Sequence, residues 1–318
     1  MIQSRTYTSN TTKLLKHLDV LKGLQNGEIS PIMLQLAPTN VCNLNCSFCC
    51  YSNRDKKLEL SFDQIKIALD NFHFLGTKSL EMTGGGSCEL HPMINEILDY
   101  AHKIGYKIGI CTNGKDLTTI KDWGIFEWVR LNLCFDKQNY EINVNHLRKF
   151  DTRISGAYVF EYTGNKEKDL KDLKTIIDFS DKEKIPTRLA VNVIQDKDLI
   201  ERDLNFLRKN VNKDLKYCFV SDFNIKTKRK NNHCYMHLIK PFIFPDGWVY
   251  SCTTIGYSVE NNLNVSNEAR LCKIEDIISY YGEIEADYNK RNCSFCKFTK
   301  QNELIEDILM ETEHNDFV

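Results

Sequence analysis

The repeated alternation of strand-like and helix-like segments is the feature that most constrains what this chain can fold into. Short apolar runs alternate with segments in which apolar residues recur every three or four positions. This alternation is typical of a parallel sheet with right-handed crossovers. About six such units precede a change of pattern near residue 215, which predicts an α/β fold with a partial (β/α)6 barrel. Strands are expected at 33–38, 79–83, 107–112, 128–135, 155–161 and 187–194, and helices at 61–75, 92–105, 166–180 and 198–209.

The strands also show a two-residue periodicity that predicts a polar barrel interior. In 128–136 and 187–194, apolar side chains occupy one face and polar side chains the other. A parallel strand that is buried on both faces should be apolar throughout, so the polar face indicates a lumen that holds a polar ligand. Asn132, Cys134 and Asn192 lie near the carboxyl ends of these strands, where barrel sites are found, and are candidate site residues.

Three charged residues on the same strand faces have a second interpretation. Glu81, Arg130 and Arg188 belong either to a ligand-binding lumen or to a buried, salt-linked layer. A buried charge is stable only when it is paired or hydrogen-bonded, so both arrangements are physically reasonable. The sequence leaves the choice open.

Three cysteines, Cys42, Cys46 and Cys49, follow the first predicted strand at short spacing. Three thiolates on one tight loop can bind three irons of a cubic iron–sulfur cluster. Cys50 follows Cys49 directly, so no fourth ligand stands at the usual spacing, and one iron would keep an open position for chemistry. The triplet alone is also consistent with a zinc knuckle or with buried thiols.

The Cys-x3-Cys-x2-Cys spacing, with Phe48 before the last cysteine, resembles the signature of the radical S-adenosylmethionine (radical SAM) enzymes. The resemblance implies that Cys42, Cys46 and Cys49 bind a [4Fe-4S] cluster whose open iron binds S-adenosylmethionine (AdoMet), with Phe48 at the cofactor. It further implies that an electron from the cluster cleaves AdoMet, and that the resulting 5′-deoxyadenosyl radical removes a hydrogen atom from the substrate. The family has a partial barrel, in agreement with the periodicity.

A glycine-rich turn follows the strand at 79–83. Glycines let a backbone approach a ligand closely, although such a turn also simply connects a strand to a helix. In the radical SAM family a Gly-Gly-Glu turn at this place contacts the AdoMet amino group. This chain has Ser87 and Cys88 where Glu-Pro is common, and Glu89 is a possible substitute. The resemblance assigns AdoMet contacts to Gly84, Gly85, Gly86 and Ser87.

Three asparagines are predicted to complete the AdoMet pocket. Asn113, in Thr-Asn-Gly, resembles a family segment that shapes this pocket, although Asn-Gly is also a common turn pair. Asn132 stands where the family often has a serine near the AdoMet ribose. Asn192 is assigned from its strand position alone.

The C-terminal part carries a second set of cysteines, placed around a hairpin predicted at Pro245-Asp246-Gly247. Four thiolates that converge can bind zinc or a second iron–sulfur cluster. Behind a radical SAM core the pattern resembles the twitch extension, which binds an auxiliary [4Fe-4S] cluster; the longer SPASM extension has further cysteines that are absent here. The predicted ligands are Cys234, Cys252, Cys293 and Cys296.

Cys272 belongs to neither set. A lone cysteine is most often a core thiol. It is also a candidate catalytic residue that donates a hydrogen atom to a substrate radical, or a further cluster ligand.

Composition limits the setting of this chemistry. The 318 residues carry a formal charge of −1, so no nucleic-acid partner is expected. No apolar run is long enough to span a membrane. Thirteen cysteines, an odd count, without an N-terminal signal segment favour the reducing cytoplasm over a secreted disulfide framework. The predicted parts are an N-terminal helical extension at 1–30, the barrel at 31–215, a small cysteine-rich hairpin-plus-helix domain at 216–300, and a C-terminal helix and tail at 301–318.

The resemblance implies an oxidoreductase that removes hydrogen from a small polar substrate, with the second cluster as an electron relay. The dehydrogenases of aminocyclitol biosynthesis are similar in this respect, and a flavodoxin- or ferredoxin-type protein would supply the electron. One alternative is a peptide-modifying enzyme, an epimerase or cross-linker. The other is a non-catalytic, zinc-binding interaction protein.

Overall fold

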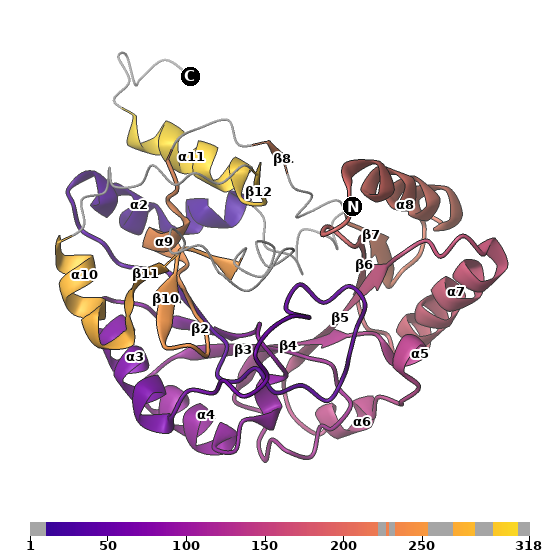
Figure 1. Ribbon diagram of the computed structural model, residues 1–318, viewed down its shortest axis with the longest axis horizontal. Helices are drawn as coiled ribbons and strands as arrows, with labels where there is room; N and C mark the ends of the chain where they lie inside the picture. The colour runs from indigo at the N-terminus through magenta and orange to yellow at the C-terminus, as the bar shows by residue number, and fades with distance from the viewer. Residues whose placement is uncertain (1–10, 222–226, 229–232, 254–269, 284–294, 311–318) are drawn as a thin grey trace.

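A ten-stranded sheet organises the molecule, which we describe from a computed structural model at residues 11–221, 227–228, 233–253, 270–283 and 295–310. Its order is β11-β10-β9-β1-β2-β3-β4-β5-β6-β7, and it curves into a barrel that stays open between its two edges (Figure 1). A short ladder of β8 (Thr227–Lys228) and β12 (Phe295–Cys296) stands apart. The strands are β1 (Met33–Leu36), β2 (Ser79–Met82), β3 (Lys107–Thr112), β4 (Phe126–Asn132), β5 (Arg153–Phe160), β6 (Thr187–Val191), β7 (Cys218–Val220), β9 (Phe242–Ile243), β10 (Trp248–Tyr250) and β11 (Arg270–Lys273).

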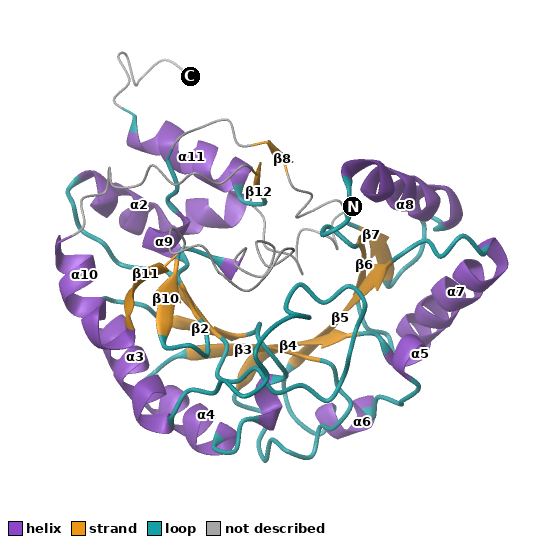
Figure 2. Cartoon of the chain, viewed as in Figure 1, coloured by secondary structure: helices purple, strands orange, loops and turns teal. Residues whose placement is uncertain are grey.

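Strands β1 to β7 pair in parallel and confirm the predicted α/β partial barrel. Helices cover the convex face of the sheet (Figures 1 and 2). Segment 113–125, between β3 and β4, contains no helix, so the crossovers are less regular than the sequence suggests. The helices on this face are α3 (Phe62–Phe74), α4 (Ile94–Lys103), α5 (Phe135–Gln138), α6 (Val144–Leu147), α7 (Lys166–Lys182) and α8 (Lys197–Asn210), with the short η2 (Cys88–Leu90) before α4.

The C-terminal hairpin extends the barrel sheet instead of forming a sheet of its own. Strand β9 pairs in parallel with β1, and β10 and β11 follow in antiparallel order. The hairpin expected around Pro245-Asp246-Gly247 is therefore confirmed, and Gly247 has a φ of 81°, which favours glycine. The short 3-10 helix η5 (Ile274–Asp276) and the helix α10 (Ile277–Glu283) then pack against α3.

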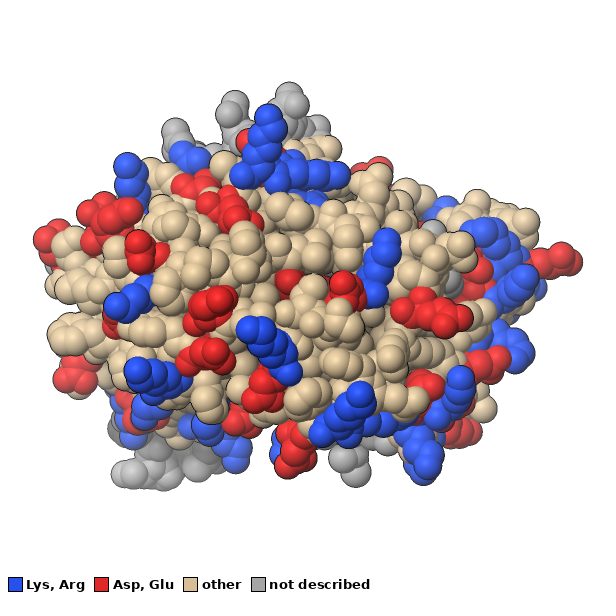
Figure 3. Space-filling view, turned by 90° about the horizontal axis from the view of Figure 1, so that it is seen from below, with Lys and Arg blue, Asp and Glu red and all other residues tan. Residues whose placement is uncertain are grey.

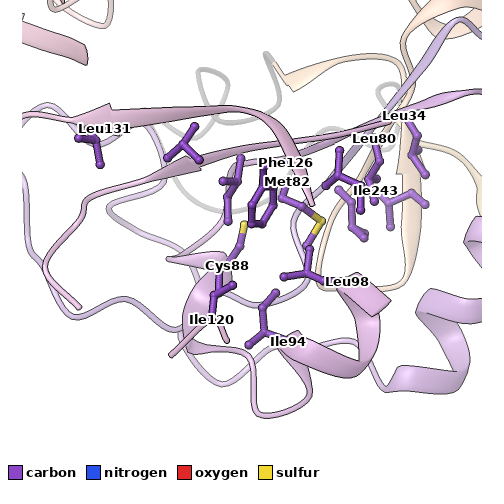
Figure 4. Close-up of a cluster of buried hydrophobic side chains, with 14 of the residues drawn as sticks. Leu34, Leu80, Met82, Cys88, Ile94, Leu98, Ile120, Phe126, Leu131 and Ile243 are labelled. Atoms are coloured by element: carbon purple, nitrogen blue, oxygen red, sulfur yellow. The ribbon is translucent and has the colours of Figure 1, made fainter. Parts of the chain in front are cut away.

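Alternation along the strands separates two layers of side chains. On the helix-covered face, Leu36 stands opposite Met82 and Ile243, and all three are fully buried. Figure 4 shows Met82 pointing toward Ile94 and Leu98 of α4 within this core. Each such side chain contributes roughly 1.5–3 kcal/mol through its burial.

The opposite layer, inside the barrel, is polar. Gln35 on β1 stands opposite Glu81 on β2, and Glu81 stands opposite Gly109 on β3. A side chain at Gly109 would collide with the Trp128 ring, which lies 2.1 Å from an ideal Cβ position. The predicted polar lumen is therefore present, with Trp128 filling part of it.

The open side of the barrel carries the two ends of the described chain (Figure 1). Buried side chains of α2, α9 and α11 form one hydrophobic cluster there, including Leu21, Leu238 and Ile305. Gln25 donates a hydrogen bond to the Ile308 carbonyl at 3.2 Å. The elements are η1 (Thr11–His17), α2 (Leu18–Gln25), α9 (Met236–Ile239) and α11 (Thr299–Leu309).

The outer surface shows no dominant charge of one sign on the face drawn in Figure 3, where acidic and basic side chains are interspersed. This agrees with the formal charge of −1. Among the described helices, none is both long and apolar enough to cross a membrane.

Candidate functional site

The three-cysteine loop leaves β1 at its carboxyl end and returns to α3. Its base is closed by backbone bonds from Asn40 N to Leu58 O at 3.0 Å and from Leu60 N to Pro38 O at 2.9 Å. Ser61 then begins α3 with the predicted capping box, in which Gln64 is the partner. The loop is thus anchored at both ends and lies where barrel proteins place their chemistry.

Arg54 holds the loop from inside, a role that no pattern in the sequence indicates. Its guanidinium donates to Asn40 O at 2.7 Å and to Tyr51 O at 2.6 Å, and its side chain is buried. The same group lies 3.7 Å from Cys49 Sγ. At this distance the guanidinium can donate a weak hydrogen bond to the sulfur. A single arginine in a polar loop has no periodicity that would reveal it.

The three thiols of the loop are partly exposed and free of disulfides. The pKa of Cys46 is raised, first by the contact with Cys134 at 3.8 Å, then by burial, then by the charges of Cys134, Cys49 and Cys42. The loop thiols are therefore close enough to influence one another. Three sulfur donors, with no imidazole or carboxylate among them, fit an iron–sulfur cluster.

Cys134 lies beside the loop and not on a strand. Strand β4 ends at Asn132, three residues before the end predicted at 135, and Cys134 is the residue that precedes α5. Its sulfur is 3.3 Å from Tyr140 Oη. The predicted strand is too long because Leu133 and Phe135 continue the apolar alternation into the turn.

The glycine turn packs directly against the cysteine loop. Gly86 N donates to Thr39 O and Ser87 N donates to Val41 O, both at 2.8 Å. An ideal Cβ on Gly86 would lie 1.8 Å from Val41 O, and Gly85 has a φ of 61°. The backbone amides of Gly86 and Ser87 therefore bind the cysteine loop and are not available to a ligand.

Ser87 and Asn113 are brought together with the loop, as the sequence predicts. Asn113 Nδ2 donates to Ser87 Oγ at 2.7 Å and to Asn43 Oδ1 at 2.8 Å. Ser87 Oγ also lies 3.4 Å from Cys42 Sγ. This small network joins the end of β3 and the glycine turn to a proposed cluster ligand.

Asn192 is connected to the opposite side of the loop. Its Nδ2 donates to Glu161 Oε1 at 3.0 Å, and Ser47 Oγ donates to Glu161 Oε2 at 2.6 Å. Glu161 is the last residue of the strand expected at 155–161 and was not singled out from the sequence; the structure ends β5 at Phe160. Phe48 and Glu161 line a cavity of about 570 Å³.

Asn132 lines a different cavity, of about 250 Å³, inside the barrel beside Tyr51 and Gly84. It is exposed there. The structure therefore divides the predicted AdoMet residues into a group at the loop and glycine turn and a residue that faces the lumen.

Glu89 lies behind the glycine turn and is buried. Thr112 Oγ1 donates to Glu89 Oε1 at 2.5 Å. Burial raises the pKa of this carboxyl to about 7, although the bond from Thr112 lowers it. Glu89 thus braces the end of β3 against the turn.

The second cysteine set is described at three of its four members, because Cys293 lies outside the described residues. Cys234, Cys252 and Cys296 all pack against the hydrophobic cluster of α2, α9 and α11. Phe298 N donates to Cys296 Sγ at 3.2 Å, as donors commonly do toward metal-bound sulfur. In the part of the chain that the structure describes, no three Cys, His, Asp or Glu side chains meet at the spacing of a single-ion site.

Cys272 does not face the barrel interior. It stands opposite Val249 on β10, and Val249 stands opposite Ile243 on β9, so all three share the helix-covered face. Cys272 is buried in the main hydrophobic core, where burial raises its pKa to about 12. The structure therefore favours a core thiol over the catalytic role.

The fold and the loop define a partial-barrel protein with a three-thiol site at the carboxyl ends of its strands. Residues 36–133 match the family described as the Radical SAM superfamily. The match includes Cys42, Cys46 and Cys49, so the resemblance drawn from these three residues is confirmed for this part of the chain.

One stretch is 30% identical over 115 residues to the antilisterial bacteriocin subtilosin biosynthesis protein AlbA of Bacillus subtilis. The match covers 36% of this chain and 25% of AlbA, so the chain spans about a quarter of that relative's length.

Solved structures share the fold over most of the chain. Streptococcus suis SuiB bound to S-adenosylmethionine has a TM-score of 0.56 at 14% identity, over 88% of this chain and 73% of SuiB. The enzyme anSMEcpe with bound AdoMet and a Cp18Cys peptide has a TM-score of 0.53 at 12% identity, over 91% of this chain and 86% of that chain. At such identities the likeness concerns the fold alone.

Proposed function

We propose that this radical SAM protein is an oxidoreductase that cleaves AdoMet reductively and removes a hydrogen atom from a small polar substrate. The observation that carries the proposal is the three-thiol loop, anchored by Arg54 and packed on the glycine turn, next to a polar lumen. Cys42, Cys46 and Cys49 hold the [4Fe-4S] cluster. When bound, cluster and AdoMet together supply the 5′-deoxyadenosyl radical.

The residues of the chain orient this cofactor pair. Gly84, Gly85 and Gly86 let the turn approach both the loop and AdoMet. Phe48 and Asn192 face AdoMet from the side of Glu161, and Asn132 faces it from the lumen. Ser87 and Asn113 act mainly by positioning Cys42, because their side chains are already bonded to each other and to the loop.

We further propose that Cys234, Cys252, Cys293 and Cys296 hold an auxiliary [4Fe-4S] cluster. With four thiolate ligands this cluster would have no site for substrate, and it would supply an acceptor for the second electron of the oxidation. A flavodoxin- or ferredoxin-type donor supplies the first electron, in the reducing cytoplasm that suits so many thiols. Support comes from the packing of three of these cysteines on one hydrophobic cluster.

A peptide substrate is the second candidate. It is favoured by the relative AlbA, named for bacteriocin biosynthesis, and is consistent with the peptide bound in the anSMEcpe structure. Incubation with AdoMet and candidate substrates separates the two by which substrate is converted. The product mass then identifies the reaction: a peptide epimerase leaves the mass unchanged in water, whereas a dehydrogenase or a peptide cross-linker lowers it by about two mass units because two hydrogens leave.

The test uses anaerobically reconstituted, reduced protein. We expect about eight irons per chain and 5′-deoxyadenosine formation from AdoMet. Substitution of Cys42, Cys46 and Cys49 by Ala should leave about four irons and abolish cleavage. Cys218→Ala, a buried thiol outside both sets, is the matched control. Zinc in place of iron, with no cleavage under any reductant, would instead support the zinc-binding interaction protein.

A further inference from the structure

The cavity inside the barrel has an unusual charge. It measures about 250 Å³, and the residues that line it include four cationic side chains: Arg130, Arg188, Lys240 and Lys297. Glu81 is the one carboxylate among the described residues that line it. The four cations come from segments far apart in the sequence, so only folding assembles them.

Glu81 is already engaged within the protein. Gln35 Nε2 donates to Glu81 Oε2 at 2.7 Å, and Lys240 Nζ lies 3.4 Å from the same oxygen. Burial alone would raise the pKa of Glu81, but the charges of Lys240 and Arg130 and the bond from Gln35 hold it below its ordinary value. Glu81 is therefore ionised and is paired with Lys240.

The excess positive charge is felt by neighbouring groups. The pKa of Lys13 is lowered by burial and then by repulsion from Arg130 and Lys240. Lys13 lines a second cavity, of about 690 Å³, which shares Glu81, Arg130 and Lys240 with the first. Cations held together in a low-dielectric lumen are costly unless an anion joins them.

The cavity lies next to the cysteine loop and the glycine turn. Cys50 and Tyr51 of the cysteine loop line it, and so does Gly84 of the glycine turn. Arg130 Nη1 is 3.9 Å from Cys111 Sγ, and its guanidinium lies over the Trp128 ring at 5.0 Å. The aromatic ring fixes the plane of the guanidinium, which suits it to a planar or tetrahedral oxyanion.

We propose that the barrel lumen binds an anionic group of the substrate, a carboxylate or a phosphate, through Arg130, Arg188 and Lys240. The proposal rests on the proposed function and narrows its substrate class to acids. It disfavours the amine-bearing aminocyclitols, because an ammonium group would meet like charges. Glu81 orients Lys240 and limits the affinity for the anion.

The test measures the binding of inorganic phosphate, succinate and a capped tripeptide with one aspartate, by calorimetry, to the reconstituted protein with AdoMet. Putrescine is the cationic comparison. We expect at least one anionic probe to bind, and Arg130→Gln to weaken it by about tenfold or more. Binding of succinate or phosphate, but not of the peptide, would indicate that the substrate is a free acid. Binding of the peptide alone would indicate that the anionic group is an acidic side chain.

Glu81→Gln gives a result of opposite sign, which a folding defect cannot imitate. Removal of the negative charge should tighten binding of the same probe several-fold, since one competing anion is lost. Lys209→Gln, the same type of charge removal at an exposed position of α8, should leave the affinity unchanged.

Three outcomes would overturn the inference. They are no binding of any anionic probe, binding of putrescine in its place, or an Arg130→Gln variant that loses AdoMet affinity but keeps probe affinity. Iron content and 5′-deoxyadenosine formation are measured on the same samples. Normal values without probe binding reject the anion site alone, whereas absent iron and absent cleavage reject the proposed function.

Discussion

At the scale of single residues, Arg54 shows how one side chain can shape a metal site without binding the metal. It joins three points of the cysteine loop that no backbone ladder holds together. Hydrogen bonds to charged donors contribute about 1.5–3 kcal/mol each. Its loss should therefore be felt in the order of the whole loop.

Arg54→Lys keeps the charge but removes the fork that reaches Asn40 O and Tyr51 O together. We expect the iron bound by the loop to fall by at least half. The free energy of unfolding should fall by about 2 kcal/mol, which lowers the melting temperature by several degrees. Iron analysis and thermal unfolding of the reconstituted protein measure both. Lys209→Arg on the outside of α8 serves as the control. Full iron content and unchanged melting in the Arg54 variant would contradict this role.

Glu89 should make stability depend on pH. Its pKa of about 7 in the folded protein exceeds the ordinary value of 4.5, so the folded state binds the proton more tightly than the unfolded state. Stability therefore falls as pH rises from about 4.5 to about 7, by up to roughly 3 kcal/mol.

Glu89→Gln removes this titration. Urea unfolding of the cluster-free protein from pH 5 to pH 8 should show the variant gaining stability relative to the wild type as pH rises. Parallel pH profiles for the two proteins would show that Glu89 does not titrate in this range.

At the scale of elements, the contact between the glycine turn and the cysteine loop determines where the loop lies. The two segments meet through the bonds of Gly86 N and Ser87 N, with no room for a Cβ at Gly86. The turn therefore sets the position of the loop directly, in addition to any contact with AdoMet.

Gly86→Ala should displace the loop, because the added methyl group would overlap Val41 O. We expect a loss of about 3 kcal/mol and loss of the loop iron even before AdoMet is added. Gly282→Ala, where a Cβ meets nothing within 4 Å, is the matched control and should be neutral or slightly stabilising. If Gly86→Ala binds iron normally and loses only AdoMet, the turn acts on the cofactor alone.

At the scale of the whole molecule, the two ends of the described chain close the open side of the barrel together. Ile305 on α11 is fully buried against the cluster that also contains Leu21 and Leu238. Cys296 precedes α11 by a few residues, so this packing also positions one proposed ligand of the auxiliary cluster.

Ile305→Ala should cost about 2–5 kcal/mol and lower the auxiliary iron while the loop iron is retained. Electron paramagnetic resonance of the reduced protein, together with iron analysis, distinguishes the two clusters. Met310→Ala, at a largely exposed side chain, is the control. If both iron–sulfur clusters were lost equally, the hydrophobic side chains of α2, α9 and α11 would support the whole barrel.

The sequence by itself determined the features whose signal is local. The apolar patterns predicted β1 to β6 and the polar inner face, because a strand exposes alternate residues to two environments. The spacing of Cys42, Cys46 and Cys49 predicted the thiol loop, because ligands on one loop are neighbours in the chain as well. The strand end after Asn132 was misplaced, since apolar alternation continues into the turn.

Only the tertiary structure decided how distant segments meet. It placed β9 on the edge of β1, which turned Cys272 toward the helices and Lys240 toward Glu81. It also used the amides of Gly86 and Ser87 to hold the loop. Register between remote strands depends on packing across the whole sheet, and a shift of one residue would exchange the lumen face for the core face. No local pattern determines this register, so the set of charged side chains that face the lumen is decided only by the folded structure.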